Sequence, residues 1–411
     1  MNNKDQHTVP SSKSAWLNST VIGIGLASLF SDWSHEIATA LLPAFLASMG
    51  SAAAWLGIIE GVADGVSSVM KMGSGYYTDR LQHRKGIAVA GYVVTAMGTA
   101  AFGLATSAWQ VLLARTAAWL GRGVRTPVRK ALLAGAVTRE TYGRAFGFER
   151  MMDTLGAIVG PLTALLLLNW FDHHYSTVFA LTLIPGLIAA LCIAVLVKEK
   201  TRVAVKHISF GESLGALPPR YKKFLLAVGV FGMGDFAHSM LILLAVQVLT
   251  PLHGVTAAVA TATVLYVVHN IVYAGFSIIA GWMADRFNKG PLLVVAYLLA
   301  AIMAAMIVFV HLNMLTLIMV FVLAGMFVAM EETLEDSFCA ELVESSHHGM
   351  AFGVLATVNG VGDFVSSTVV GLLWSSMGIA VAFGFSAVLF VAGAMLTLRV
   401  VRAGHVQPAT G

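Results

Sequence analysis

Twelve apolar runs of about twenty residues or more make up most of the chain. An α-helix of about twenty apolar residues is long enough to cross the hydrocarbon core of a bilayer. Hydrophobic residues make up 58% of the chain and charged residues 11%, a ratio that no soluble core requires. We therefore expect an all-α membrane protein with twelve transmembrane helices. The runs lie at 20–48, 53–76, 86–105, 109–132, 142–168, 176–197, 222–250, 256–283, 291–311, 314–340, 349–374 and 377–399.

Lysine and arginine are distributed unevenly between the connecting segments. The segments after runs 1, 3, 5, 7, 9 and 11 contain neither, whereas those after runs 2, 4, 6 and 8 are basic. Because basic loops stay in the cytoplasm, we expect both termini and the even-numbered loops there. The first run is too long for a signal-peptide core, so we interpret it as a retained span, in a bacterial inner membrane. This topology accounts for the net charge of +4, and no nucleic-acid partner is expected.

Short motifs repeat at a fixed distance along the chain. GYYTDR at Gly75–Arg80 matches GWMADR at Gly281–Arg286, each at the end of a second run of six. GRAFG at Gly143–Gly147 matches GMAFG at Gly349–Gly353, each at the start of a fifth run. Both pairs are offset by the same 206 residues, which chance similarity would rarely produce.

The repeat divides the chain into two equivalent halves. A basic segment with two adjacent prolines lies between the sixth and seventh runs. We therefore expect an N-terminal six-helix half at 1–197, a cytoplasmic linker at 198–223 and a C-terminal six-helix half at 224–411. Two pseudo-symmetric halves with a site between them are typical of secondary transporters.

The loop after the second run reads GYYTDRLQHRK, from Gly75 to Lys85. It resembles the signature of the major facilitator superfamily, and the resemblance covers essentially the whole chain. In that family the aspartate of this loop helps to latch the cytoplasmic side when the transporter is open outward. The resemblance implies a monomer with a cytoplasmic gate that includes Asp79 and Arg80 and their repeats Asp285 and Arg286. The alternative is that these are solvated residues at a helix end.

The fifth run contains GFERMMDTLGAIVGP, in which Gly147, Gly156, Gly160 and Pro161 are spaced like the family's antiporter motif. That resemblance implies export in exchange for protons. Small residues on one helix face also allow close helix packing, and proline bends a helix, so a generic packing face is the alternative.

Ionisable residues lie inside several apolar runs, where a charge costs about 2.5–3.5 kcal/mol on insertion scales. The pattern Asp-x-x-His occurs twice, in SDWSH (Ser31–His35) and in GDFAH (Gly234–His238). If runs 1, 4, 7 and 10 line a central cavity, as they do in the family, both patterns face that cavity. The candidates for binding a substrate or metal are Asp32, His35, Asp235, His238, His269, Asn270, Asp153, Asn359 and Asp363.

These residues suit three roles. A desolvated carboxylate can take up a proton on one side and release it on the other, and two neighbouring carboxylates favour sharing one proton. Histidines with carboxylates can also bind transition metals, although no His-x-x-x-His spacing is present. Histidines can instead donate structural hydrogen bonds. We predict proton coupling for Asp32, Glu36 and Asp64, and the family resemblance adds Arg115.

Opposite charges occupy equivalent places in the fourth and tenth runs. Shifted by 206 residues, Arg125, Arg129 and Lys130 fall on Glu331, Glu335 and Asp336. We predict that they form a cytoplasmic ion-pair gate between the halves, since alternating access requires a bistable closure. The alternative is that each cluster is solvated or satisfied within its own half.

The resulting prediction is a secondary active transporter that exports a small polar or cationic solute by proton-coupled alternating access. The alternatives are a carrier of a transition metal or of a siderophore-type metal chelate, and a proton symporter that imports its substrate. The expected partners are the lipid bilayer, protons and the solute or metal ion. No cofactor is expected, because the proton gradient drives transport and a metal would be the substrate. The chain has no motif of a nucleophile elbow or phosphate loop, so an enzyme is not expected.

Overall fold

The computed structural model describes residues 16–50, 54–172, 174–199 and 209–405, and every regular element in them is a helix. The N-terminal half contains α1 (Ser19–Ser48), α2 (Ala54–Thr78), α3 (Lys85–Ala100), η1 (Ala101–Leu104), α4 (Ala108–Ala136), η2 (Arg139–Thr141), α5 (Tyr142–Trp170), α6 (Tyr175–Leu181) and α7 (Leu183–Leu196). The predicted linker contains α8 (Phe210–Gly215). The C-terminal half contains α9 (Pro219–Gly232), α10 (Ser239–His253), α11 (Val255–Arg286), α12 (Lys289–Phe309), α13 (Met314–Leu342), η3 (Ser345–His347), α14 (His348–Met377) and α15 (Ile379–His405).

The twelve predicted spans correspond to these helices, which confirms the predicted fold class. Within the described residues, eight helices are both long and apolar enough to cross a membrane. The four other spans are α1, α2 and α4, which carry charged residues in their interiors, and the interrupted pair α9–α10. Most of the charged residues inside α1, α2 and α4 belong to the networks described below, whereas α9 and α10 have only 14 and 15 residues.

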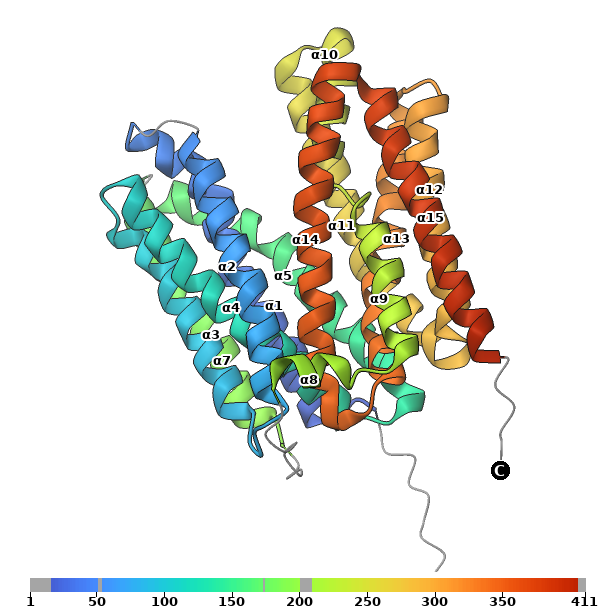
Figure 1. The fold of residues 1–411 in the computed structure, drawn as a ribbon. Helices are drawn as coiled ribbons and strands as arrows, with labels where there is room; N and C mark the ends of the chain where they lie inside the picture. Colours follow the sequence, from blue (N-terminus) through green and yellow to red (C-terminus); the bar gives the residue numbers. More distant parts are fainter. Residues whose placement is uncertain (1–15, 51–53, 173, 200–208, 406–411) are drawn as a thin grey trace, which may run out of the picture.

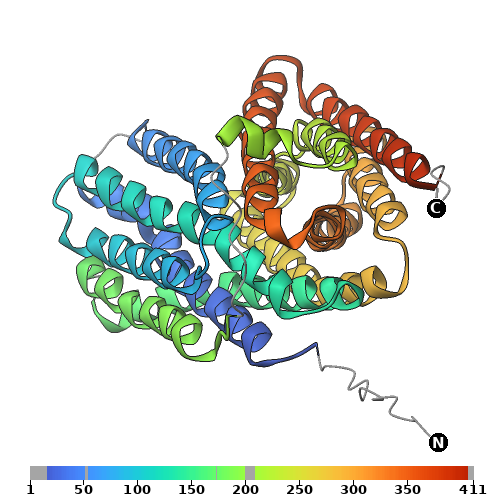
Figure 2. The same cartoon turned by 60° about the horizontal axis from the view of Figure 1, so that its bottom comes forward.

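The helices form two bundles that meet at one end and lean apart at the other (Figure 1). The end at which they meet carries α8, and Figure 2 shows the two bundles packed side by side there. Contact between the halves is made chiefly by α5 against α11 and by α2 against α14. A Cβ added to Gly75 would lie 3.0 Å from Cα of Gly353, and one added to Gly147 would lie 3.1 Å from Cα of Gly281. Glycines therefore permit close approach of the halves at two repeat-related places.

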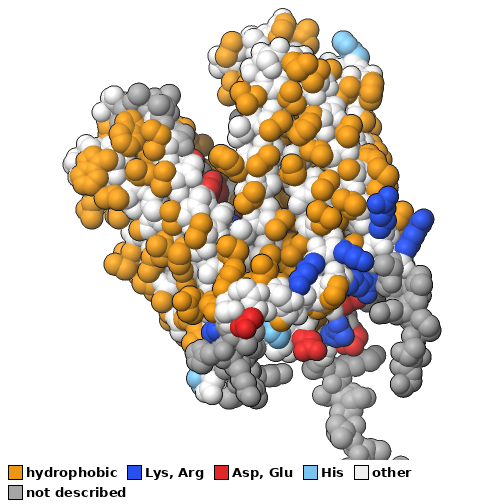
Figure 3. Space-filling model, viewed as in Figure 1, with side chains coloured by type: hydrophobic (Ala, Val, Ile, Leu, Met, Phe, Trp, Pro, Cys, Tyr) orange, Lys and Arg blue, Asp and Glu red, His pale blue; other side chains and the backbone are white. Residues whose placement is uncertain are grey.

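The side chains on the surface also distinguish the α8 end of the molecule from the rest. Figure 3 shows hydrophobic side chains over most of the visible surface, whereas lysine and arginine gather at the end that carries α8. An acidic side chain is visible in the opening between the two halves. An apolar belt of this kind is what a bilayer covers, and the chain is an integral membrane protein.

The seventh span differs from the prediction of one continuous run at 222–250. Helix α9 ends at Gly232 and α10 begins at Ser239, and the segment between them is not helical. Glycines at 232 and 234 lower the helix propensity at this point. The equivalent first span, α1, continues without a break through its Asp-x-x-His pattern.

Candidate functional site

Two adjoining cavities contain most of the predicted site. One, of about 190 Å³, is lined by residues of both halves, and the other, of about 230 Å³, is lined by the C-terminal half. Of the nine predicted substrate or metal residues, His35 lines neither cavity. The first cavity is lined by Asp32, Asp153, His238, His269 and Asn270, and the second by Asp235, His238, Asn359 and Asp363.

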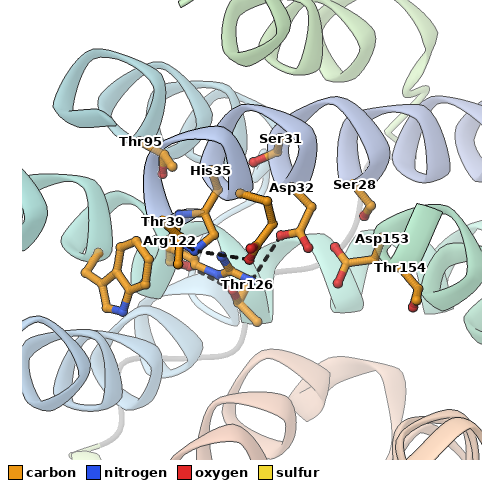
Figure 4. A network of polar contacts seen from close by, with 12 residues as sticks. Ser28, Ser31, Asp32, His35, Thr39, Thr95, Arg122, Thr126, Asp153 and Thr154 are labelled. Carbon is orange, nitrogen blue, oxygen red and sulfur yellow. Dashed lines mark hydrogen bonds and ion pairs between the residues drawn. The ribbon is translucent and has the colours of Figure 1, made fainter. Parts of the chain in front are cut away.

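The carboxylates on the N-terminal side are paired with arginine. Nη2 of Arg122 in α4 lies 3.2 Å from Oδ1 of Asp32 in α1. Nη2 of Arg129 lies 2.9 Å from Oε1 of Glu149, and these side chains are 8% and 1% exposed. Asp153 lies 3.7 Å from Arg129 and is also paired with an arginine one turn earlier on α5. Figure 4 shows Asp32 and Asp153 directed into the same space, from two different helices.

A second network on the N-terminal side lies away from both cavities. Nη2 of Arg115 lies 2.8 Å from both carboxylate oxygens of Glu60, and Cζ of Arg115 lies 3.7 Å from the ring centroid of Trp119. Trp119 donates a hydrogen bond of 2.6 Å to Asp64, and its ring contacts that of His35, with centroids 4.4 Å apart. This network ties α1, α2 and α4 together. Of the predicted proton-coupling residues, only Asp32 lines one of the two cavities.

Three acidic residues of the C-terminal half that line the second cavity, here called the C-terminal wall, are not paired with any arginine that the structure describes. They are Asp235, Glu331 and Asp363, and none of their carboxylates forms a hydrogen bond or a close ion pair among the described residues, although the positive charge of Lys71 in α2 acts on Asp363. Glu331 is only 6% exposed. Glu335 differs, since it accepts hydrogen bonds from Tyr297 (2.5 Å) and from Asn359 (2.8 Å). An unpaired carboxylate in such a place favours a proton or an external cation.

The histidines do not converge on a metal site. Within the described ranges, no group of three or more His, Cys, Asp or Glu side chains is placed to hold a metal ion. The rings of His238 and His269 lie 4.7 Å apart, and Nδ1 of His269 lies 3.3 Å from the carbonyl oxygen of Phe321. Asn270 donates to the carbonyl of Tyr266 one turn earlier. The predicted metal site is therefore not supported by this geometry.

Only part of the predicted ion-pair gate is formed in this conformation. Nζ of Lys130 lies 2.6 Å from Oδ1 of Asp336, and these two residues occupy equivalent positions of the repeat. The prediction is wrong for Arg125, which donates to Ser31 of its own half and stacks on a tyrosine ring. It is also wrong for Arg129, Glu331 and Glu335, which have the surroundings described above. Arg129 pairs instead with acids of its own half, Glu149 and Asp153 on α5.

Arg150 is a cross-half residue that the sequence analysis missed. Its Nε lies 2.9 Å from Oε2 of Glu332 in α13, and its Nη1 lies 3.3 Å from Oδ2 of Asp153. Glu332 also accepts a hydrogen bond from Tyr273. The signal was present in the sequence, because Arg150 precedes Asp153 by three residues and so shares its helix face.

The loop aspartates join the two halves in a symmetric way. Asp79 accepts hydrogen bonds from the backbone N–H groups of Gly349 (2.8 Å) and Met350 (2.7 Å), in the first turn of α14. Asp285 accepts from those of Gly143 (2.7 Å) and Arg144 (3.2 Å), in the first turn of α5. Each aspartate thus stabilises the N-terminus of a helix in the opposite half.

Arg80 and Arg286, which follow these two aspartates, make other contacts. Arg80 donates to the carbonyl of Tyr76 (2.8 Å) and to Ser213 of the linker helix α8 (3.3 Å). Arg286 stacks on the ring of Trp282, one turn earlier on its own helix. The place of Arg80 and Arg286 in the cytoplasmic gate therefore stays a prediction, and the contacts described here link Arg80 to the linker helix and Arg286 to its own helix.

The glycines of the fifth span form a packing face. A Cβ on Gly156 would lie 2.9 Å from the backbone nitrogen of Trp33, and one on Gly160 would lie 3.2 Å from Cα of Glu36. Both glycines therefore hold α5 against α1, whereas Gly147 lies against α11. Pro161 lies inside α5.

A family model described as the Major Facilitator Superfamily matches residues 24–330 and 224–410. The chain belongs to this superfamily. It is 26% identical over 382 residues to an uncharacterized MFS-type transporter of Methanocaldococcus jannaschii, covering 93% of this chain and 95% of that protein. It is 28% identical to a protein of Cupriavidus pinatubonensis named "Probable 4-methylmuconolactone transporter", covering 84% and 81% of the two chains.

Solved structures of the superfamily share the fold. The human organic anion transporter MFSD10 superposes with a TM-score of 0.73 at 15% identity, covering 92% of this chain and 99% of that one. The fucose:proton symporter FucP of E. coli superposes with a TM-score of 0.73 at 16% identity, covering 93% and 99%. This protein is thus a secondary transporter of the major facilitator kind and not an enzyme.

Proposed function

We propose that this transporter exchanges protons for a small organic cation and exports that cation from the cytoplasm. The observation that carries the proposal is the set of three unpaired carboxylates, Asp235, Glu331 and Asp363, around the cavity of about 230 Å³. A proton and a cation compete for such a set, since either one neutralises it. This competition is the basis of exchange.

The N-terminal wall supports the same proposal. Of the predicted proton-coupling residues, Asp32 lines one of the two cavities described above, and its partner Arg122 is 29% exposed, so solvent reaches this pair. Protonation of Asp32 would release Arg122 and change the charge that the cavity presents to the solute. In this scheme Asp32 couples protonation to the state of the cavity, while the acids of the C-terminal wall bind the cation.

The direction and topology rest on the sequence. The glycine spacing of the fifth span favours exchange, and the lysine and arginine pattern places the α8 end in the cytoplasm. The aspartate bonds of Asp79 and Asp285 and the Lys130–Asp336 pair then close the cytoplasmic side in an outward-open conformation. We propose a monomer that needs no cofactor, because the proton gradient supplies the free energy.

Proteoliposomes with an internal pH dye test this function. Quaternary ammonium ions, such as tetramethylammonium and choline, carry no dissociable proton, so any pH change reports transport by the protein. Exchange predicts that external quaternary ammonium raises the internal pH, whereas proton symport predicts that it falls. Separate arms with benzenesulfonate, a neutral sugar and Mn²⁺ test the other solute classes.

Three variants and one control assign the response to the site. Asp235→Asn, Glu331→Gln and Asp363→Asn are each expected to reduce it at least tenfold. Asp172→Asn is the matched control, because Asp172 is exposed in the turn after α5 and its positive φ of 47° suits asparagine. A response to Mn²⁺ or benzenesulfonate alone, or one that persists in all three variants, would refute cation exchange.

A further inference from the structure

The interruption of the seventh span leaves backbone groups without helical partners. The N–H of Asp235 donates to the carbonyl of Gly232 (3.0 Å), and the N–H of Leu241 donates to that of His238 (3.0 Å), so the regular helical ladder stops on either side. Between these turns, the carbonyl of Asp235 and the N–H of Ala237 lie outside both helices. Inside a membrane such groups are tolerated only where protein or a cavity satisfies them.

Two consecutive serines of α14 satisfy these groups. Oγ of Ser366 donates to the carbonyl of Asp235, and Oγ of Ser367 accepts a hydrogen bond of 3.1 Å from the N–H of Ala237. Ser366 is fully buried. A donor and an acceptor on adjacent residues therefore match an unpaired carbonyl and an unpaired N–H two residues apart.

Packing on either side fixes the same segment. A Cβ on Gly362, one turn before Ser366, would lie 3.0 Å from Cα of Gly232, so α14 touches the end of α9. The ring of Phe236 packs edge-on against Phe383 of α15, with centroids 4.8 Å apart. These contacts with α14 and α15 fix the backbone of the segment, and Asp235 and His238 line the cavities.

The N-terminal half lacks this arrangement at the equivalent place. A shift of 206 residues takes Ser366 and Ser367 to Gly160 and Pro161, neither of which has a side-chain hydroxyl. There α5 packs against an unbroken α1 through Gly160. The hydroxyl pair and the helix interruption thus occur together in one half and are absent together from the other.

We propose that Ser366 and Ser367 are positioning residues that hold the seventh span open at 233–238 and so place Asp235 and His238 at the cavity. The inference goes beyond the proposed cation exchange and holds for any solute, because it concerns only the backbone of the seventh span.

Hydrogen–deuterium exchange of the purified full-length protein tests the inference without a solute. In Ser367→Ala the N–H of Ala237 loses its acceptor, and we expect exchange in a peptide covering 233–241 to become about tenfold faster. Ser367→Thr keeps the acceptor and should exchange like the wild type, since this position is partly exposed and has room for a methyl group. Ser366→Ala is expected to accelerate the same peptide.

The control is Ser375→Ala with Ser376→Ala, on the same helix. These serines are exposed and bond only to the carbonyl of Leu372 in their own helix. The control should leave the peptide 233–241 unchanged. Unchanged exchange in both Ser366→Ala and Ser367→Ala, failure of Ser367→Thr to restore protection, or acceleration spread evenly over α9 and α14 would each overturn the proposal. Loss of the quaternary ammonium response with the exchange pattern intact would reject only the proposed function.

Discussion

The two halves of this transporter have the same architecture but handle buried charge in opposite ways. In the N-terminal half, the acids at the cavity and behind it are paired with arginines, as Asp32 is with Arg122 and Glu149 with Arg129. In the C-terminal half, three acids around a cavity have no such partner within the described chain. A fully buried pair such as Glu149 and Arg129 keeps its charges, whereas Asp32, whose arginine is partly exposed, can gain a proton, and an unpaired acid can gain a proton or a cation. This contrast gives the halves different roles. The fully buried pairs of acid and arginine in the N-terminal half form a fixed frame, and the unpaired acids of the C-terminal wall can respond to protons and cations.

The duplicated Asp-x-x-His pattern shows the same difference on a smaller scale. In α1 the pattern lies on an intact helix, where Asp32 meets Arg122 and His35 packs on Trp119. In the seventh span the pattern lies where the helix is interrupted, and both Asp235 and His238 reach a cavity. The aspartate of each pattern therefore lines a cavity, whereas the histidine packs on a tryptophan in α1 and lines the cavities in the seventh span.

The largest expected effect is on the frame. Arg129→Ala leaves Glu149 buried without its arginine, and Glu149 is only 1% exposed. Breaking a buried ion pair from one side lowers the free energy of unfolding by about 3–5 kcal/mol. Unfolding in a titration with sodium dodecyl sulfate would measure the loss. Arg399→Ala, at an exposed position of α15, should change it by less than about 0.5 kcal/mol. Equal effects would show that the N-terminal network does not stabilise this half.

A smaller effect is expected where the halves join. Asp79→Ala and Asp285→Ala each remove a carboxylate that accepts two backbone hydrogen bonds from the opposite half. Hydrogen bonds to charged groups contribute about 1.5–3 kcal/mol, so each variant should shift the population away from closure at the α8 end by tenfold or more.

Spin labels at the exposed positions Gln82 and Glu344 would report this shift as a longer distance between the halves. Cys192 and Cys339 would be replaced first, with the cysteine-free protein as reference. Asp172→Asn, at the other end of the molecule, should leave the distance distribution unchanged. If the two aspartate variants also leave it unchanged, their bonds do not hold the halves together.

Sequence reasoning predicted the features that depend on period and repeat. The spans follow from hydropathy, and the 206-residue offset placed Asp79 and Asp285 in equivalent roles before their partners were known. It failed where three-dimensional proximity decides the partner. Arg129 had several acids within reach and took Glu149 rather than Glu335, a choice that spacing along the chain does not contain. Likewise, no local sequence pattern predicts that Ser366 contacts an interrupted helix.

The next largest effect is expected for the ion pair between Lys130 and Asp336. Lys130 and Asp336 are repeat-equivalent and in contact, so they lie beside the axis that relates the halves. A double-mutant cycle with Lys130→Met and Asp336→Asn is expected to give a coupling energy of about 1–2 kcal/mol. The matched control is Lys289 with Glu341, which has the same 2.6 Å separation but lies within one half and is 39% exposed at the acid. Its coupling should stay below about 1 kcal/mol. Equal coupling energies would mean that an ion pair between the halves stabilises the protein no more than one within a half.

The sharpest test of the comparison applies one substitution to two buried glutamates, and the smallest effect on stability is expected at Glu331. Glu149→Gln removes a charge that Arg129 needs, and should lower the free energy of unfolding by about 1–3 kcal/mol. Glu331→Gln removes an unpaired charge and should change it by less than about 1 kcal/mol, or raise it. The transport assay should respond in the opposite order, with Glu331→Gln losing the proton response. If both glutamines destabilise the protein equally, Glu331 is paired in the folded protein and the C-terminal wall is as fixed as the frame.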